Sequence, residues 1–222
     1  KFVCVDPHDM PIIAVVDPDM MSSMPKSLTA SSGMDALTHA IEGYTTRGAW
    51  EMTDMFHLKA IEIISKSLRG AVANTKEGRE GMALGQYIAG MGFSNVGLGV
   101  VHGMAHPMGS LFDIPHGVAN ALLLPTIMEF NKPVCIEKYV EIAKAMDAYK
   151  DGMTKAEAAQ AACDAVRALA IEVGIPQHLS DLGITEKDID ALADQAIEDV
   201  CTPGNPRLVT RQDIVDLYKK VL

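Results

Sequence analysis

The sequence predicts a mainly α fold, a bundle-like helical domain that follows one or two short N-terminal strands. Hydrophobic residues make up 48% of the 222 residues and aromatic residues only 5%. The apolar content is therefore carried by aliphatic side chains and 14 methionines, a composition that favours helices. Apolar residues recur at helical spacing from residue 25 onward, whereas residues 1–17 contain short apolar runs that are typical of strands.

The two strand candidates are residues 2–5 and 12–16, and each run is followed by an Asp-Pro pair. Two strands do not make a sheet that is stable by itself. We therefore expect them to belong to a larger sheet whose other strands lie outside this sequence.

The first two helices are predicted from their caps and their spacing. Ser27 is placed to cap a helix that ends near Gly43, and a second helix is expected over residues 51–70. Residues 79–106 are expected to form one or two Gly-rich helices. Because each Gly costs about 1 kcal/mol of helix propensity relative to Ala, this composition favours close backbone packing around a site.

Pro107 is expected to break the helical pattern before His116, and residues 118–130 to form a buried helix. Three further amphipathic helices are expected over residues 134–147, 154–173 and 186–200. Thr154 and Thr185 each begin a capping-box pattern, and Thr210 begins a last helix over residues 212–221.

Charge and cysteine content exclude several classes of function. The net charge of −10 disfavours nucleic acids and anionic membrane surfaces as partners, because both require a basic surface. No apolar run approaches the roughly 20 residues that span a bilayer, and no segment resembles a signal peptide. The four cysteines are scattered without a CxxC pair, which predicts a reduced, cytoplasmic protein.

The most informative pattern is a set of acidic and histidine residues with metal-ligand spacing. Asp35 and His39 lie four residues apart, as do His102 and His106, and His116 follows in a Pro-His-Gly segment. Residues at i and i+4 share one helix face, so each pair can reach one ion. One carboxylate and three imidazoles suit a divalent transition metal. Spacing leaves His102 and His106 equally placed for the third histidine, and the other one would be free to transfer protons.

A structural interpretation competes with the metal site, because one Asp-x-x-x-His pair on a helix is common. His8, His57 and His178 lie in contexts typical of loops or helix surfaces, and we interpret them so. The other four histidines lie in apolar, Gly-rich segments, where an unpaired buried polar group costs about 1–3 kcal/mol. Their clustering there favours a metal site.

Four stretches resemble the iron-containing (group III) alcohol dehydrogenases: SGMDALTHAIEGY at residues 32–44, TRGAW at 46–50, GMGFSN at 90–95 with the following histidine segments, and DVCTPGNPR at 199–207. The resemblance extends over essentially the whole chain. It implies a dehydroquinate synthase-like fold, in which an α/β dinucleotide-binding domain precedes a helical metal-binding domain. Residues 1–24 would then be remnant strands of the first domain, and residues 25–222 the helical catalytic domain. No GxGxxG motif follows a strand here.

The resemblance also implies roles for individual residues. The implied metal ligands are Asp35, His39, His102 and His116, and the implied catalytic residue beside the metal and the nicotinamide is His106. The implied substrate pocket includes Phe93 and Cys201, and the implied dinucleotide contacts are Lys1 and His106.

The implied activity is NAD(H)-linked interconversion of a short aldehyde and alcohol, with Fe(II) polarising the carbonyl oxygen. Residues 48–50 and the Cys201 loop indicate the branch that acts on lactaldehyde and 1,2-propanediol. Zn(II) suits the same ligands. NAD(H) would bind through the domain outside this chain, and we expect a homo-oligomer, a dimer or larger.

Three alternatives remain open. The substrate could be another short alcohol, such as 1,3-propanediol, butanol or methanol. The chain could be a non-catalytic helical metal-binding module. A metal-dependent hydrolase would need a carboxylate base near the metal, and Glu42 is the nearby candidate, although it could instead support a ligand or pack within the helix.

Overall fold

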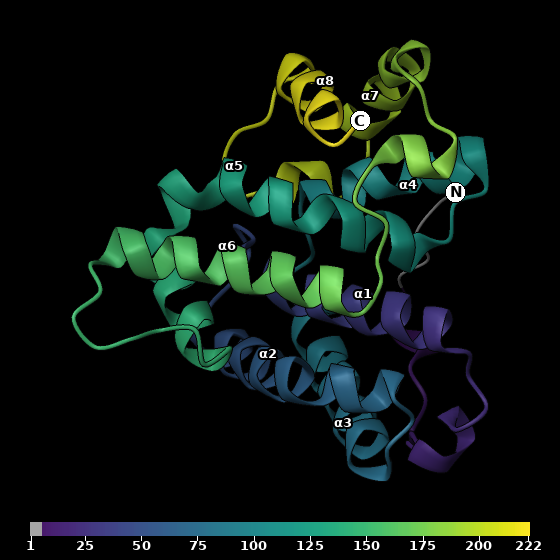
Figure 1. The fold of residues 1–222 in the computed structure, drawn as a ribbon, viewed down its shortest axis with the longest axis vertical. Coiled ribbons are helices and arrows are strands. Elements are labelled where there is room, and N and C mark those ends of the chain that lie inside the picture. The colour runs from purple at the N-terminus through teal and green to yellow at the C-terminus, as the bar shows by residue number, and fades with distance from the viewer. Residues whose placement is uncertain (1–5) are drawn as a thin grey trace.

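The computed structural model describes residues 6–222, and helices form its entire regular secondary structure in that range (Figure 1). The α-helices are α1 (Lys26–Thr45), α2 (Glu51–Val72), α3 (Lys76–Phe93), α4 (Val100–Phe112), α5 (His116–Ala145), α6 (Lys155–Glu172), α7 (Ile189–Ile197) and α8 (Arg211–Lys220). Short 3-10 helices are η1 (Pro7–Asp9), η2 (Pro18–Met21), η3 (Leu179–Leu182), η4 (Glu186–Asp188) and η5 (Thr202–Gly204). The prediction of a mainly α fold is confirmed.

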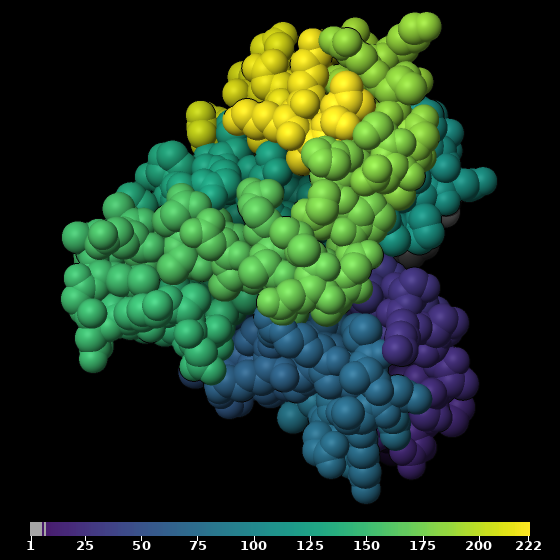
Figure 2. Space-filling view, viewed as in Figure 1, coloured from purple at the N-terminus to yellow at the C-terminus, as the bar shows by residue number. Residues whose placement is uncertain are grey.

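Helix α1 is the centre of the arrangement. It packs against α2 and α3 on one side and against α5 on another, while α6 lies along α5 and α4 contacts α5 and α7. Figure 1 shows α2 and α3 at one end of the molecule and α7 and α8 at the other. In the space-filling view the surface of α6 meets that of α2 (Figure 2), and Arg69 of α2 forms an ion pair with Glu172 of α6.

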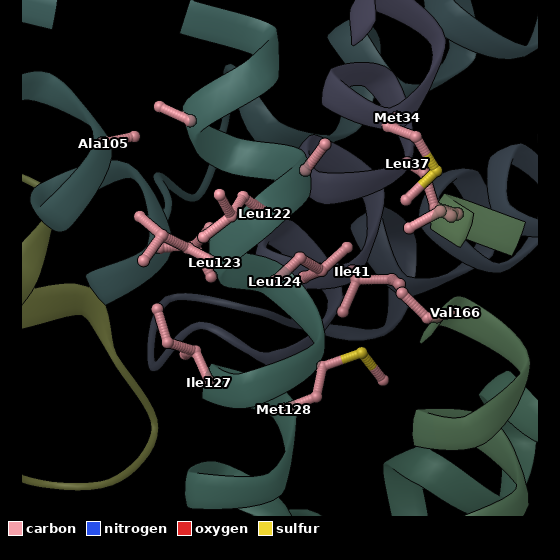
Figure 3. Packing of buried hydrophobic residues seen from close by; sticks show 14 of the residues in the cluster. Met34, Leu37, Ile41, Ala105, Leu122, Leu123, Leu124, Ile127, Met128 and Val166 are labelled. Atoms are coloured by element: carbon pink, nitrogen blue, oxygen red, sulfur yellow. The ribbon is translucent and has the colours of Figure 1, made fainter. Parts of the chain in front are cut away.

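The core explains why α1 is central. Met34, Leu37 and Ile41 are fully buried. Figure 3 shows them on the side of α5 from which Leu124 and Met128 project, with Val166 of α6 beside Ile41. A helix that is buried on most of its circumference belongs in the interior rather than at the surface. Asp35 and His39 lie on this helix and are therefore held by an element that is buried along most of its length.

The predicted caps of the C-terminal helices are present. Thr154 Oγ1 accepts a hydrogen bond from the Glu157 amide, and the Glu157 side chain accepts one from the Thr154 amide. The same reciprocal pairing joins Thr210 with Asp213. At Thr185 the Asp188 side chain accepts from the Thr185 amide and hydroxyl, while the Asp188 amide donates to the Thr185 carbonyl oxygen. These short-range signals predicted the helix starts because a capping box uses only four consecutive residues.

Two predictions for the N-terminal part are not met. Residues 12–16 form no strand; they are exposed, and without a partner strand among residues 6–222 their backbone has no ladder to join. The other expected strand, residues 2–5, lies outside the described residues. Ser27 lies inside α1 and is not its cap, because the helix begins at Lys26, directly after Pro25.

The helix boundaries around the prolines also differ from the prediction. Pro107 lies inside α4, whose neighbours α5 and α7 hold it helical, and the chain breaks instead at Asp113, with a left-handed φ of 55°. The helices expected over residues 118–130 and 134–147 are continuous in α5, with a kink at Cys135, two residues after Pro133. Within residues 6–222, the structure contains no helix with both the length and the apolar character needed to cross a bilayer.

Candidate metal centre

The four residues expected as metal ligands come together from three helices. Asp35 and His39 lie one turn apart on α1, His102 lies in the first turn of α4, and His116 is the first residue of α5. One ligand atom of each residue lies within 4.8 Å of those of the other three. Helix packing thus brings together groups that are up to 81 residues apart in the chain.

The distances suit one ion. The Nε2 atoms of His39 and His102 are 3.1 Å apart. Asp35 Oδ1 lies 3.9 Å from His102 Nε2 and 3.8 Å from His116 Nε2. Ligand atoms at about 2.0–2.2 Å from a tetrahedral ion lie roughly 3.3 Å apart, so only small movements separate this arrangement from a coordinating one.

The protonation pattern of the histidines also fits a cation. His39 Nδ1 lies 2.8 Å from the backbone carbonyl oxygen of Asp35, to which it donates, so its Nε2 carries a lone pair. His102 Nδ1 lies 2.6 Å from a carboxylate oxygen of Glu42, to which it donates, so the Nε2 atom of His102 carries the lone pair and faces the site. Two lone pairs directed at each other across 3.1 Å repel unless a cation lies between them. The donor set therefore fits a divalent metal.

Glu42 supports this arrangement from behind. Its carboxylate is buried and accepts hydrogen bonds from the amides of Val101, at 2.7 Å, and His102, at 3.3 Å. Because Gly99 has no side chain to cap α4, Glu42 caps that helix from α1. Burial raises the pKa of Glu42 to about 7, and the hydrogen bonds from the α4 amides limit this rise. With its oxygens used in this way, Glu42 does not suit the role of a hydrolase base.

Asn120 belongs to the site, although the sequence interpretation assigned it no role. Its Nδ2 atom lies 2.6 Å from Asp35 Oδ1, 3.0 Å from His102 Nε2 and 3.1 Å from His116 Nε2. Asn120 follows His116 by four residues on α5. The same i, i+4 spacing that marked Asp35 and His39 could therefore have indicated it.

His106 lies beside the four ligands rather than among them. Its ring stacks on that of His116, with centroids 5.4 Å apart and planes inclined by 15°. His106 Nδ1 lies 2.7 Å from Asp199 Oδ2. Burial acts to raise the pKa of Asp199, but the hydrogen bonds from His106 and from the Cys201 amide hold it below its ordinary value.

The residues expected in the substrate pocket border the same region. Phe93, the last residue of α3, has its ring centroid 4.4 Å from that of His39. Cys201 is partly buried, and a ligand atom of Cys201 lies within 4.8 Å of those of His106 and Asp199. Lys1, the other expected dinucleotide contact, lies outside the described residues.

Two glycines allow the close approaches that the site requires. A Cβ at Gly117 would lie 2.5 Å from the Ser31 carbonyl oxygen, so only glycine lets the start of α5 approach α1 beside Asp35. A Cβ at Gly103 would lie 2.1 Å from Thr202 Oγ1, so glycine also lets α4 lie close to Thr202, the residue after Cys201. The Gly-rich composition of this region thus corresponds to close packing around the ligands.

His57 differs from its predicted surface position. It is completely buried in α2, and neither ring nitrogen has a hydrogen-bond partner among residues 6–222. Its ring lies between α1 and α3, where a Cβ at Gly43 or Gly92 would come within 2.4 Å of Nε2. Ala60 and Ile61, at i+3 and i+4, are also buried, which places this residue on the inner face of the helix.

Comparison with known proteins agrees with this arrangement. The profile of the Fe-containing alcohol dehydrogenase family, C-terminal, matches residues 29–222. The chain is 61% identical over 218 residues to lactaldehyde reductase of Escherichia coli K12, covering 98% of this chain and 57% of the relative. It is 42% identical over 222 residues to 1,3-propanediol dehydrogenase of Citrobacter freundii, covering 99% of this chain and 57% of that protein. The chain thus spans a little over half the length of these relatives.

Solved structures show the same fold. A 1,3-propanediol oxidoreductase superposes with a TM-score of 0.91 at 42% identity, covering 93% of this chain and 55% of the other. A sulfoacetaldehyde reductase from Bifidobacterium kashiwanohense, in complex with NAD+, superposes with a TM-score of 0.88 at 30% identity, covering 98% and 56%. The helices that carry the four candidate ligands are therefore part of a shared architecture.

Proposed function

Because the chain belongs to the Fe-containing alcohol dehydrogenase family, we propose that it is the metal-binding part of an enzyme that interconverts a short aldehyde and its alcohol with NAD(H). The observation that carries this proposal is the convergence of Asp35, His39, His102 and His116, with the Nε2 atoms of His39 and His102 3.1 Å apart. The 61% identity to a lactaldehyde reductase favours lactaldehyde and 1,2-propanediol as the substrate pair.

We propose that residues 25–222 are the helical catalytic domain and that residues 1–24 belong with a dinucleotide-binding α/β domain. The exposed apolar side chains of Ile12, Ile13 and Val15 support this division, because such a run suits a strand inside a sheet. The relatives named above are longer than this chain, and NAD(H) would bind in the part that the chain does not contain.

The four ligands would hold Fe(II), and Zn(II) suits the same donors. When bound, the metal supplies a Lewis acid that polarises the substrate oxygen. The chain's own contribution is to present neutral imidazoles. His39 Nδ1–H donates a hydrogen bond to the carbonyl oxygen of Asp35, and His102 Nδ1–H donates one to the carboxylate of Glu42. Each proton therefore stays on Nδ1, and both Nε2 lone pairs face the site.

His106 is the proposed proton-transfer residue. Its Nδ1 is engaged by Asp199, which leaves Nε2 to accept a proton during alcohol oxidation and to return it during aldehyde reduction. Phe93 and Cys201 would line the substrate pocket, and the Phe93 ring against His39 would keep water from one side of the ligands. Lys1 and His106 would face the dinucleotide.

Metal content separates these roles. After anaerobic purification, we expect about one iron or zinc ion per chain in the wild type, loss of the ion in His116→Ala, and retention in His106→Ala. Loss of the ion in His106→Ala would identify that residue as a ligand and refute its proposed role. Absence of metal in the wild type, even after reconstitution with Fe(II) or Zn(II), would refute the metal site.

Activity is tested in the full-length protein with a panel of lactaldehyde, 1,2-propanediol, 1,3-propanediol, butanol and methanol. We expect the highest kcat/KM for lactaldehyde and a lower kcat, with metal retained, in His106→Ala. A higher kcat/KM for another alcohol in the panel would refute lactaldehyde and 1,2-propanediol as the substrate pair. Bound metal without turnover of any of these compounds would instead indicate a non-catalytic metal-binding module.

A further inference from the structure

We propose that Asn120 is a positioning residue for the metal: its side-chain amide gathers Asp35, His102 and His116 around one point before the ion binds, and it sets the affinity of the site by holding the Asp35 carboxylate once the ion is bound. This inference rests on the metal binding proposed above. It assigns a role to a residue that is not itself among the four ligands.

The contacts of the amide nitrogen carry the first step. Nδ2 lies 2.6 Å from Asp35 Oδ1 and 3.0–3.1 Å from Nε2 of His102 and His116. An amide nitrogen has two hydrogens and serves only as a donor, whereas the carboxylate oxygen and the two lone pairs are acceptors. One group therefore contacts ligand atoms from α1, α4 and α5 at once.

The orientation of the amide shows which interaction dominates. Turned the other way, its oxygen would face a carboxylate and two nitrogen lone pairs, all of which would repel it. In the orientation present, Oδ1 is buried and has no hydrogen-bond partner among residues 6–222. Asn120 is fully buried, and leaving its oxygen unpaired is unfavourable. The side chain is thus oriented by the ligands rather than by its own hydrogen-bonding needs.

Metal binding changes only part of this network. The Nε2 lone pairs of His102 and His116 would be used for the ion, so these two hydrogen bonds compete with it. Asp35 Oδ1 has a further lone pair, so its hydrogen bond from Asn120 persists when the carboxylate is a ligand. Hydrogen bonds of this kind behind a metal ligand typically account for about 10- to 100-fold in affinity.

A Co(II) titration followed by visible absorption, with a chelator as competitor, tests the inference. Asn120→Ala should weaken Co(II) binding by about 10- to 100-fold and change the Co(II) spectrum. Asn131→Ala is the matched control, because Asn131 is also a buried asparagine on α5 but pairs with Asn205. This control should lower the melting temperature. Its Co(II) affinity should stay within threefold of that of the wild type, and its Co(II) spectrum should be unchanged.

The outcomes separate this inference from the proposed function. Equal or tighter Co(II) binding by Asn120→Ala than by wild type would overturn the role of Asn120 while leaving the metal site intact. Failure of the wild type to bind Co(II) would overturn both. If the alanine variant does not fold, Asn120→Ser replaces it in the same titration, because the serine hydroxyl lies near the position of the amide carbon and away from the ligands.

Discussion

The buried imidazole of His57 should make the stability of this protein depend on pH in the mildly acidic range. His57 is 0% exposed and has no hydrogen-bond partner for either ring nitrogen among residues 6–222. Burial, together with the positive charge of Lys138, lowers its pKa from 6.5 to about 4. The ring is therefore neutral in the folded protein at pH values where it is protonated in the unfolded chain.

The sign and the size of the effect follow from this difference. Between pH 6.5 and pH 4 the unfolded chain binds a proton at His57 that the folded protein does not, so stability falls as the pH falls through this range. At 1.36 kcal/mol per pKa unit, the loss from His57 between pH 8 and pH 5 is about 2 kcal/mol. Above pH 6.5 the contribution is constant.

Urea unfolding at pH 8 and pH 5 measures this loss when the wild type is compared with His57→Leu. The wild type should lose about 2 kcal/mol more of its unfolding free energy than the variant, because leucine has no group to protonate. His178→Leu is the control, since it makes the same change at an exposed position and should keep the wild-type pH dependence. Equal losses in wild type and His57→Leu would refute the assignment of this pH dependence to the buried ring.

Two further predictions concern the packing around α4. Glu42→Gln replaces a carboxylate that accepts hydrogen bonds from the α4 amides and from His102 Nδ1 with an amide that also donates. It should lower the free energy of unfolding in urea by about 1–3 kcal/mol and weaken Co(II) binding about 10- to 100-fold. Unchanged values in both measurements would contradict the role of Glu42 as helix cap and as support for His102. Gly103→Ala places a Cβ 2.1 Å from Thr202 Oγ1 and should lower the free energy of unfolding by about 1–3 kcal/mol. Gly90→Ala is the control: no atom lies within 4 Å of the added carbon, so this substitution should be neutral or stabilising by up to about 1 kcal/mol. Equal effects of the two substitutions on the melting temperature would contradict this account.

The sequence by itself determined the features that depend on near neighbours in the chain. Helical spacing predicted a mainly α fold, and the capping-box pattern at Thr154 and the predicted helix start at Thr210 located the beginnings of two helices. The i, i+4 spacing of Asp35 and His39 indicated a shared helix face. Such features are predictable because a cap, a helical turn and a side-chain pair each involve only three or four residues along the chain.

Pro107 shows where local rules end. Proline disfavours a helix interior, yet α4 continues through it because the helix packs against α5 and α7. The expected strand at residues 12–16 shows the converse: an apolar run becomes a strand only when a partner strand is available. Propensity acts within one segment, and contacts between segments can outweigh it.

Only the tertiary structure decided which side chains meet. Spacing alone left His102 and His106 equivalent, and the packing of α4 against α5 and α7 places His102 with Asp35 and His106 with Asp199. The packing of α2 against α1 and α3 buried His57, and the packing of α5 against α1 and α4 brought Asn120 to three ligands. Apart from the contact of Asn120 with His116, four residues away, these contacts join residues 18 to 93 positions apart. Their geometry depends on how whole helices approach one another, which no short sequence pattern encodes.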